Sequence, residues 1–274
     1  MSDGETIILY SVDGLALDAR VHPPAATASD LASAVEGAVV LAHGIVADLD
    51  EGGMYRRLAD QLAAAGLGVL RFSFRGHGAS AGTQRGVTIA GELLDVEAAI
   101  GHARAEFDGP LTVLGSSFGA VAVVESSVYT HPDQLILWNP VLDLRRTFVE
   151  PELPWGQTNF NSDAWRRAMI EGALLVDGTF ELGRTLLTEF SRYQPDEVFK
   201  SSEVPALIVH GDRDSYVSYD IARAAAQVRG CDFHTLAGSD HGFDTRERED
   251  EAIAVTVAWV TGTYRADHPG TGIR

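Results

Sequence analysis

The sequence predicts an α/β fold with a mostly parallel central sheet and helices on both of its faces. Short apolar runs alternate along the chain with longer segments of helical apolar spacing, and this alternation is typical of a parallel sheet. Most of the apolar runs end in turns rich in Gly, His, Ser or Asp, the residues expected at functional strand ends. A chain of 274 residues suffices for one large domain of this kind or two small ones.

The N-terminal part predicts a hairpin followed by the first inner strand. Two β-rich runs, 6–10 and 15–21, flank Val12-Asp13-Gly14, and Asp-Gly between apolar runs is a hairpin signal. Residues 23–34 are a connector rich in Pro, Ala and Ser. Residues 37–42 are continuously apolar, as expected of a strand buried inside a parallel sheet.

The following elements continue the alternation. Before residue 140 we expect strands at 68–74, 111–114 and 134–138, and helices at 55–65, 88–105 and from 120 to near 130. After residue 203 we expect strands at 205–209 and 232–236 and helices at 219–228 and 249–261.

The alternation of apolar runs and helical segments stops between residues 141 and 202. This stretch is rich in aromatic and charged residues and has no clear strand, and Pro151 and Pro154 break any single helix. We therefore expect a mostly helical insertion. The predicted organisation is a core of 1–140 and 203–264, a helical cap at 141–202, and a flexible tail at 265–274.

Composition limits the class of protein. A hydrophobic content of 45% and a charged content of 22% are those of a globular protein, and no apolar run approaches the ~18 residues of a membrane span. The polar, acidic N-terminus and the single cysteine favour the cytoplasm. The net charge of −18 argues against nucleic acid and anionic membrane surfaces as partners.

The stretch Gly115-Ser-Ser-Phe-Gly119 is the most informative motif. It lies between a predicted strand and a predicted helix, the context that a G-x-S-x-G nucleophile elbow requires. Ser117, the middle residue, would occupy a sharp turn with its hydroxyl projecting from the end of the sheet. Ser116 has the wrong offset from the glycines and is expected beneath the turn. The alternative is an ordinary turn rich in small residues.

A serine nucleophile needs a base, and the base needs an orienting carboxylate. Asp214 and His241 follow two later predicted strands and supply these groups in the chain order Ser, Asp, His. Asp212 competes with Asp214 for the role of the acid.

Five motifs in order resemble those of the α/β-hydrolases over nearly the whole chain, from the N-terminal hairpin to residue 261. They are His43-Gly44, Arg75-Gly-His-Gly78, Gly115–Gly119, His210-Gly-Asp-Arg-Asp214 and Ser239-Asp-His-Gly242. Within that superfamily the chain is most similar to the serine-aminopeptidase-like and cinnamoyl (feruloyl) esterase-like group. The resemblance implies a Ser–His–Asp triad, an oxyanion hole of two amides and a helical cap.

Carried over by position, the resemblance assigns Ser117 as nucleophile, His241 as general base and Asp214 as acid. The oxyanion hole would be the backbone N–H groups of Phe118, which follows the nucleophile, and Ile45, which follows His43-Gly44. Three further histidines, His43, His77 and His210, would stabilise loops at the same end of the sheet.

The aromatic residues Trp155, Phe160 and Trp165 are candidates for substrate binding in the cap, with packing of the cap's own core as the alternative. Arg145 and Arg146 would contact an anionic substrate or pair with nearby acids.

The expected function is a serine hydrolase that cleaves a small-molecule carboxylic ester. An acyl thioesterase on CoA- or carrier-bound chains is the main alternative, followed by a peptidase and by a ligand-binding protein without activity. No His, Cys and carboxylate cluster has metal-ligand spacing, and we expect neither a metal nor a cofactor. The sequence does not decide between a monomer and a homodimer.

Overall fold

The structure, a computed structural model, describes residues 3–25 and 36–265. Most of the predicted connector, 26–34, and the predicted tail from residue 266 lie outside the described residues.

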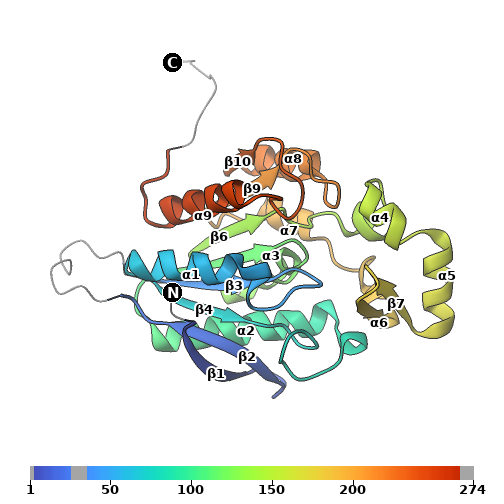
Figure 1. The fold of residues 1–274 in the computed structure, drawn as a ribbon, viewed down its shortest axis with the longest axis horizontal. Helices are drawn as coiled ribbons and strands as arrows, with labels where there is room; N and C mark the ends of the chain where they lie inside the picture. Colours follow the sequence, from blue (N-terminus) through green and yellow to red (C-terminus); the bar gives the residue numbers. More distant parts are fainter. Residues whose placement is uncertain (1–2, 26–35, 266–274) are drawn as a thin grey trace, which may run out of the picture.

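Within the described residues, eight strands form one sheet in the order β1-β2-β4-β3-β5-β6-β9-β10 (Figure 1). They are β1 (Glu5–Tyr10), β2 (Ala16–His22), β3 (Ala38–Ala42), β4 (Gly68–Phe72), β5 (Leu111–Ser116), β6 (Gln134–Trp138), β9 (Ala206–Gly211) and β10 (Asp232–Leu236). β2 pairs antiparallel with β1, as the predicted hairpin, and with β4, whereas all other neighbours are parallel. The prediction of a mostly parallel sheet is therefore confirmed.

Helices cover both faces of the sheet (Figure 1). The larger helices of the core are α1 (Met54–Ala64), α2 (Ile89–Glu106), α3 (Gly119–Thr130), α8 (Tyr219–Arg229) and α9 (Arg246–Val260). On β3, Val39 packs in the cluster that holds α1 and α9, and its neighbour Val40 packs in the cluster that holds α2, α3 and α8. Successive side chains of a strand point to opposite faces, so a strand covered on both faces must be apolar throughout.

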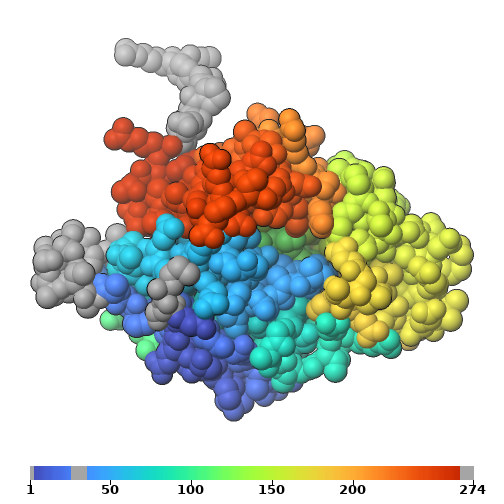
Figure 2. Space-filling model, in the orientation of Figure 1, coloured from blue at the N-terminus to red at the C-terminus, as the bar shows by residue number. Residues whose placement is uncertain are grey.

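We call residues 141–202, between β6 and β9, the cap segment. It contains a π-helical turn (Arg145–Val149), α4 (Pro154–Asn159), α5 (Ser162–Glu171), β7 (Ala173–Val176), β8 (Phe180–Gly183), α6 (Arg184–Glu189) and α7 (Pro195–Ser201). The part from α4 to α6 forms a lobe at one side of the molecule, yellow-green to yellow in Figures 1 and 2. α7 packs instead against α3 and α8, with Phe199 in the main core, so the lobe ends before α7 although the predicted cap extends to residue 202.

The expectation that the cap segment has no strand is wrong. β7 and β8 pair antiparallel in a separate two-stranded sheet. Residues 177–179 connect them, and Asp177 and Gly178 have positive φ angles of 49° and 68°, as residues in a tight hairpin connection often do. The Asp-Gly signal that predicts the N-terminal hairpin is present here as well, but each strand has only four residues and the alternation of buried side chains is short.

No helix within the described parts of the chain is long and apolar enough to span a bilayer.

Candidate active site

The turn between β5 and α3 has the geometry of a nucleophile elbow. Ser117 has a φ angle of +50°, which is strained for a residue with a Cβ. A Cβ on Gly115 would lie 2.7 Å from the Ala120 Cα, and one on Gly119 would lie 2.2 Å from the His43 carbonyl oxygen. Only glycine fits at these two positions, so the G-x-S-x-G spacing allows strand, helix and the β3 loop to approach this closely.

Three side chains from distant parts of the chain form one hydrogen-bonded row. The Ser117 Oγ lies 2.8 Å from the His241 Nε2, and the His241 Nδ1 lies 2.8 Å from the Asp214 Oδ2. Ser117 follows β5, Asp214 follows β9 and His241 follows β10, so all three lie beyond the carboxyl ends of parallel strands. The exposed Asp212 carboxylate instead accepts the Gly238 N–H at 2.5 Å.

The Asp214 carboxylate accepts four N–H groups. Its Oδ1 accepts the backbone N–H of Tyr216 at 2.8 Å and of Val217 at 2.9 Å, and its Oδ2 lies 3.1 Å from the His210 Nε2 as well as 2.8 Å from His241. Burial alone would raise the pKa of Asp214, but the charge of His241 and the hydrogen bonds from both histidines lower it well below its usual value. The ionised carboxylate therefore holds the proton of neutral His241 on Nδ1 and leaves the Nε2 lone pair facing Ser117.

The His241 side chain is held by charge and by packing. Burial would lower its pKa, but the Asp214 charge and hydrogen bond, with smaller contributions from Glu51 and Asp240, raise the pKa above its usual value. The imidazole stacks on the Tyr216 ring at a centroid distance of 4.8 Å and an interplanar angle of 6°. The ring that would accept the serine proton is thus fixed in both position and tautomer.

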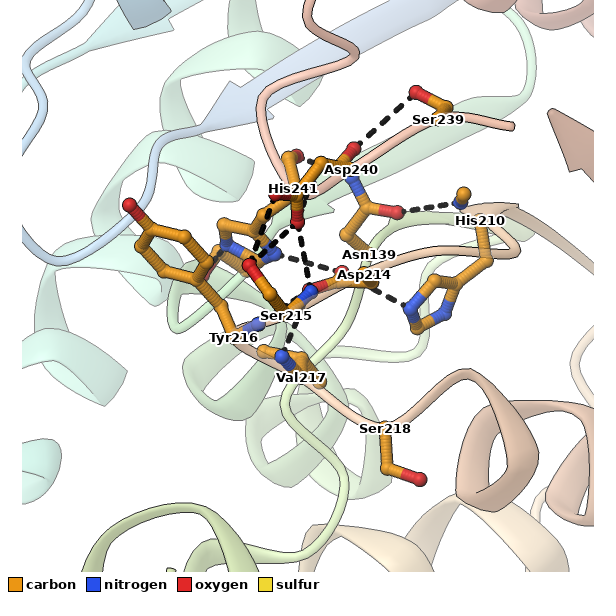
Figure 3. A network of polar contacts seen from close by, with 12 residues as sticks. Asn139, His210, Asp214, Ser215, Tyr216, Val217, Ser218, Ser239, Asp240 and His241 are labelled. Atoms are coloured by element: carbon orange, nitrogen blue, oxygen red, sulfur yellow. Dashed lines mark hydrogen bonds and ion pairs between the residues drawn. The ribbon is translucent and has the colours of Figure 1, made fainter. Parts of the chain in front are cut away.

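Two further polar residues connect the loops that carry Asp214 and His241 (Figure 3). Asp240 accepts the Ser215 N–H and the His241 N–H through its Oδ1, at 2.7 and 2.8 Å. Asn139 donates from Nδ2 to the His241 carbonyl at 2.5 Å and accepts the Gly211 N–H at 3.0 Å. No role follows from the sequence for Asn139, Asp240 or Tyr216, although Asn139 directly follows the predicted strand 134–138 and Asp240 lies inside a quoted motif.

The backbone N–H groups of Ile45 and Phe118 donate to no acceptor among the residues that the structure describes. The loop that carries Ile45 is held from two sides by histidines. The His77 Nε2 lies 2.7 Å from the Ile45 carbonyl, and the His43 Nδ1 lies 2.7 Å from the Gly44 carbonyl. Both residues line the same cavity as Ser117, the placement that an oxyanion hole requires.

Glu51 is an active-site neighbour that sequence reasoning missed. It lies in a short 3₁₀ turn, Glu51–Gly53, and its Oε2 accepts the Gly44 N–H at 2.7 Å. Burial raises the pKa of Glu51 to about 7, although the Gly44 hydrogen bond and the His241 charge act in the opposite direction. No local pattern around residue 51 distinguishes this carboxylate from a surface acid.

A cavity of about 90 Å³ opens beside Ser117 and His241. Its other walls are mostly apolar or aromatic side chains together with two acids: Ile45, Val46, Phe118, Val141, Phe148, Trp155, Tyr216, Val217, Glu51 and Asp177. Trp155, one of the three predicted cap residues, borders it. Phe160 and Trp165 do not. Phe160 packs against Phe148, and the Trp165 indole donates to the Phe148 carbonyl at 2.9 Å.

The cap places no basic side chain in this cavity, as far as the described residues define its walls. Arg145 and Arg146 lie on the surface and pair with Glu150 and Glu152. Within residues 3–25 and 36–265, no group of three or more His, Cys, Asp or Glu residues is arranged to hold a metal ion.

Comparisons with known proteins identify the family and the fold. Residues 39–255 match the family model described as "Alpha/beta hydrolase family". A search of curated protein sequences finds no match.

Solved structures share the fold at low sequence identity. Est1E from Butyrivibrio proteoclasticus with bound ferulic acid aligns with a TM-score of 0.74 and 20% identity over 93% of this chain and 97% of its own. DcsB, solved with a substrate analogue, aligns with a TM-score of 0.72 and 15% identity over 95% and 99%. The esterase domain of a Rhodothermus marinus protein aligns with a TM-score of 0.67 and 22% identity over 94% and 98%.

Proposed function

The chain belongs to the α/β-hydrolase family, and from this premise we propose that it is a serine hydrolase that cleaves carboxylic esters. The observation that carries the proposal is the row of hydrogen bonds from Ser117 through His241 to Asp214, 2.8 Å at each step. A nucleophile, a base and an orienting acid in contact are what acyl transfer requires.

In the first half of the proposed reaction, the Ser117 Oγ attacks the ester carbonyl carbon while the His241 Nε2 takes the hydroxyl proton. The carbonyl oxygen becomes an oxyanion that accepts the Ile45 and Phe118 N–H groups. The tetrahedral intermediate then breaks its bond to the alkoxy oxygen, which receives the proton from His241 and leaves as the alcohol. The acyl group remains as an ester on Ser117.

In the second half, His241 takes a proton from a water molecule, and the resulting hydroxide adds to the acyl carbon. The second tetrahedral intermediate expels the Ser117 oxygen, which recovers its proton from His241, and the carboxylic acid departs. Asp214 stays ionised throughout, because four N–H groups hold its carboxylate, and it stabilises the imidazolium formed in each half.

The cavity supports a short, uncharged acyl group. Its volume of about 90 Å³ is well below the ~300–1,000 Å³ of typical ligand pockets. The acids Glu51 and Asp177 border it, so an anionic acyl group would meet repulsion. Trp155 supplies an aromatic wall from the cap.

The same features favour an ester over a long acyl thioester of coenzyme A. A long chain exceeds the cavity, and the phosphates of coenzyme A need basic partners, whereas Arg145 and Arg146 are already paired with acids. The thioesterase and peptidase alternatives therefore rank below the ester hydrolase.

The test is hydrolysis of p-nitrophenyl esters from acetyl to palmitoyl, run beside acyl-CoA thioesters of the same lengths. We expect the highest kcat/KM on the shortest esters and a loss of at least ~10³-fold in Ser117→Ala. Ser116→Ala is the matched control, because Ser116 is the adjacent serine and is buried under the turn. An active Ser117→Ala would contradict the serine mechanism, and an unmodified protein without activity on any substrate would favour a ligand-binding role.

A further inference from the structure

The Glu51 carboxyl group lies between the oxyanion loop and the proposed base, and the reaction steps above assign it nothing. A Cβ built on Gly44 would lie 3.2 Å from the Ser117 Cβ and 3.6 Å from the Glu51 Oε1. The nucleophile and this carboxyl group therefore flank Gly44 together, and both border the cavity.

The backbone around residue 51 has an uncommon left-handed conformation, which sets the direction of this side chain. Glu51 has a φ angle of +44°, and the next two residues, Gly52 and Gly53, have φ angles of +64° and +94°. A left-handed conformation is common for glycine and uncommon for glutamate. The turn is closed by hydrogen bonds from the Glu51 N–H to the Asp48 carbonyl and from the Gly53 N–H to the Asp50 carbonyl. A non-glycine residue in such a conformation beside a site indicates that its side chain is needed there.

We propose that Glu51 is a positioning residue of the reaction, which fixes the loop bearing the Ile45 amide and exerts its charge on the His241 imidazole. This inference rests on the proposed serine hydrolase mechanism. It has two separable parts, a hydrogen bond and a charge.

The hydrogen bond acts through the main chain. The Gly44 N–H donates to the Glu51 Oε2 at 2.7 Å, and Gly44 immediately precedes Ile45. With the His77 contact to the Ile45 carbonyl, this bond fixes the loop on both sides of the peptide that carries the oxyanion donor. The Glu51 carboxyl group thus keeps the Ile45 N–H in position before the oxyanion forms. Such preorganisation of the donors is the main source of oxyanion stabilisation.

The charge acts on the base. The ionised carboxylate of Glu51 contributes to raising the pKa of His241. Glu51 interacts with the titratable groups of Asp48 from its own loop, Tyr55 from α1 and His241 from the loop after β10. The pKa of His241 is also raised by Asp214 and Asp240. Because Glu51 itself has a pKa of about 7, its charge is lost as the pH falls below neutrality, and the titration of His241 is coupled to it.

Two substitutions separate the parts. Glu51→Gln keeps an oxygen for the Gly44 N–H but removes the charge, and Glu51→Ala removes both. We expect Glu51→Ala to lower kcat roughly 10- to 100-fold with little change in KM, because the loop loses its anchor. We expect Glu51→Gln to recover most of that kcat. In both variants the acid limb of the kcat/KM profile should move to lower pH, since a nearby negative charge no longer favours the imidazolium.

Glu189→Gln is the matched control. The Glu189 Oε2 also accepts a backbone N–H, that of Ile89 at 2.6 Å, and burial also raises the pKa of Glu189, but the residue lies in α6 away from the cavity. We expect its kcat, KM and pH profile to match those of the unmodified enzyme, and thermal unfolding of all variants would report any general loss of structure.

The inference is overturned if both Glu51 variants keep the unmodified kcat and acid limb. It is also overturned if they raise KM alone, because Glu51 would then bind the substrate and not position the loop. Either result with an inactive Ser117→Ala leaves the serine mechanism standing. An active Ser117→Ala removes the mechanism itself, so the two failures are distinguishable.

Discussion

The Asp214→Asn substitution tests the proposed mechanism at one contact, that between the side chain of residue 214 and the His241 Nδ1. The asparagine can place its oxygen at either carboxylate position. The Oδ1 faces the backbone N–H groups of Tyr216 and Val217, which can only donate. The Oδ2 faces the rings of His210 and His241, which can change tautomer and so accept a hydrogen bond. The amide oxygen is therefore expected to face the backbone, and the NH₂ group to face the two rings.

The consequence is that the His241 imidazole carries its proton on the wrong nitrogen. A His241 Nδ1 that accepts from the new NH₂ group must carry its proton on Nε2, facing the nucleophile, and cannot take the serine proton. We expect kcat to fall by about 10⁴-fold, the usual effect of this change in a Ser–His–Asp triad. That factor corresponds to about 5.4 kcal/mol of transition-state stabilisation.

Stability should change much less, because all four contacts keep a donor and an acceptor. All four hydrogen bonds lose the charge of their acceptor, but the cost of burying that charge is also removed, and we expect the free energy of unfolding to fall by about 2 kcal/mol. The assay is p-nitrophenyl acetate hydrolysis beside urea unfolding, with Asp212→Asn as control, since that exposed carboxylate accepts the Gly238 N–H of a surface loop. A variant that keeps more than about a tenth of the activity would refute the tautomer argument.

Two other predictions concern the support of His241. Tyr216→Leu removes the ring stacked on the imidazole at 4.8 Å, so kcat for p-nitrophenyl acetate should fall about tenfold. Tyr216→Phe keeps the ring and should keep the rate. Equal rates for both variants would argue against a role of the stack in positioning His241. Asn139→Gly removes hydrogen bonds to the His241 carbonyl and from the Gly211 N–H, so urea unfolding should report a loss of about 2–4 kcal/mol. Asn139→Ala should cost about 1 kcal/mol more, because residue 139 has a φ angle of +42°; a smaller loss in alanine than in glycine would contradict the strain argument.

The sheet and the elbow could be predicted because their signals are local. A buried parallel strand needs an unbroken apolar run, and the elbow needs glycines at fixed offsets from Ser117, so both are visible within a few residues. The order of Ser117, Asp214 and His241 is also visible, because each follows a predicted strand. The four-residue strands β7 and β8 gave too short a pattern for the same reasoning.

The supporting residues could not be predicted in the same way. Asn139 contacts His241 across 102 positions of sequence, and Glu51 reaches Gly44 only because its turn has three left-handed residues in succession. These contacts depend on loop conformation, which apolar periodicity does not encode. In the cap, Trp155 and Phe160 lie only five positions apart, yet Trp155 borders the cavity and Phe160 packs in the interior of the lobe.

The stack on His241 continues into the cap. Trp155 lies on Tyr216 at 5.0 Å with an interplanar angle of 17°, and its backbone N–H donates to the Ser215 carbonyl. Three rings in series thus join the cap segment to His241, the proposed base. Because linkage is reciprocal, a ligand that moves the indole changes the free energy of the imidazole's orientation, and the orientation of the imidazole changes the affinity for that ligand by the same amount. If His241 acts as the proposed base, ligand binding against the cap and proton transfer are linked through these three rings.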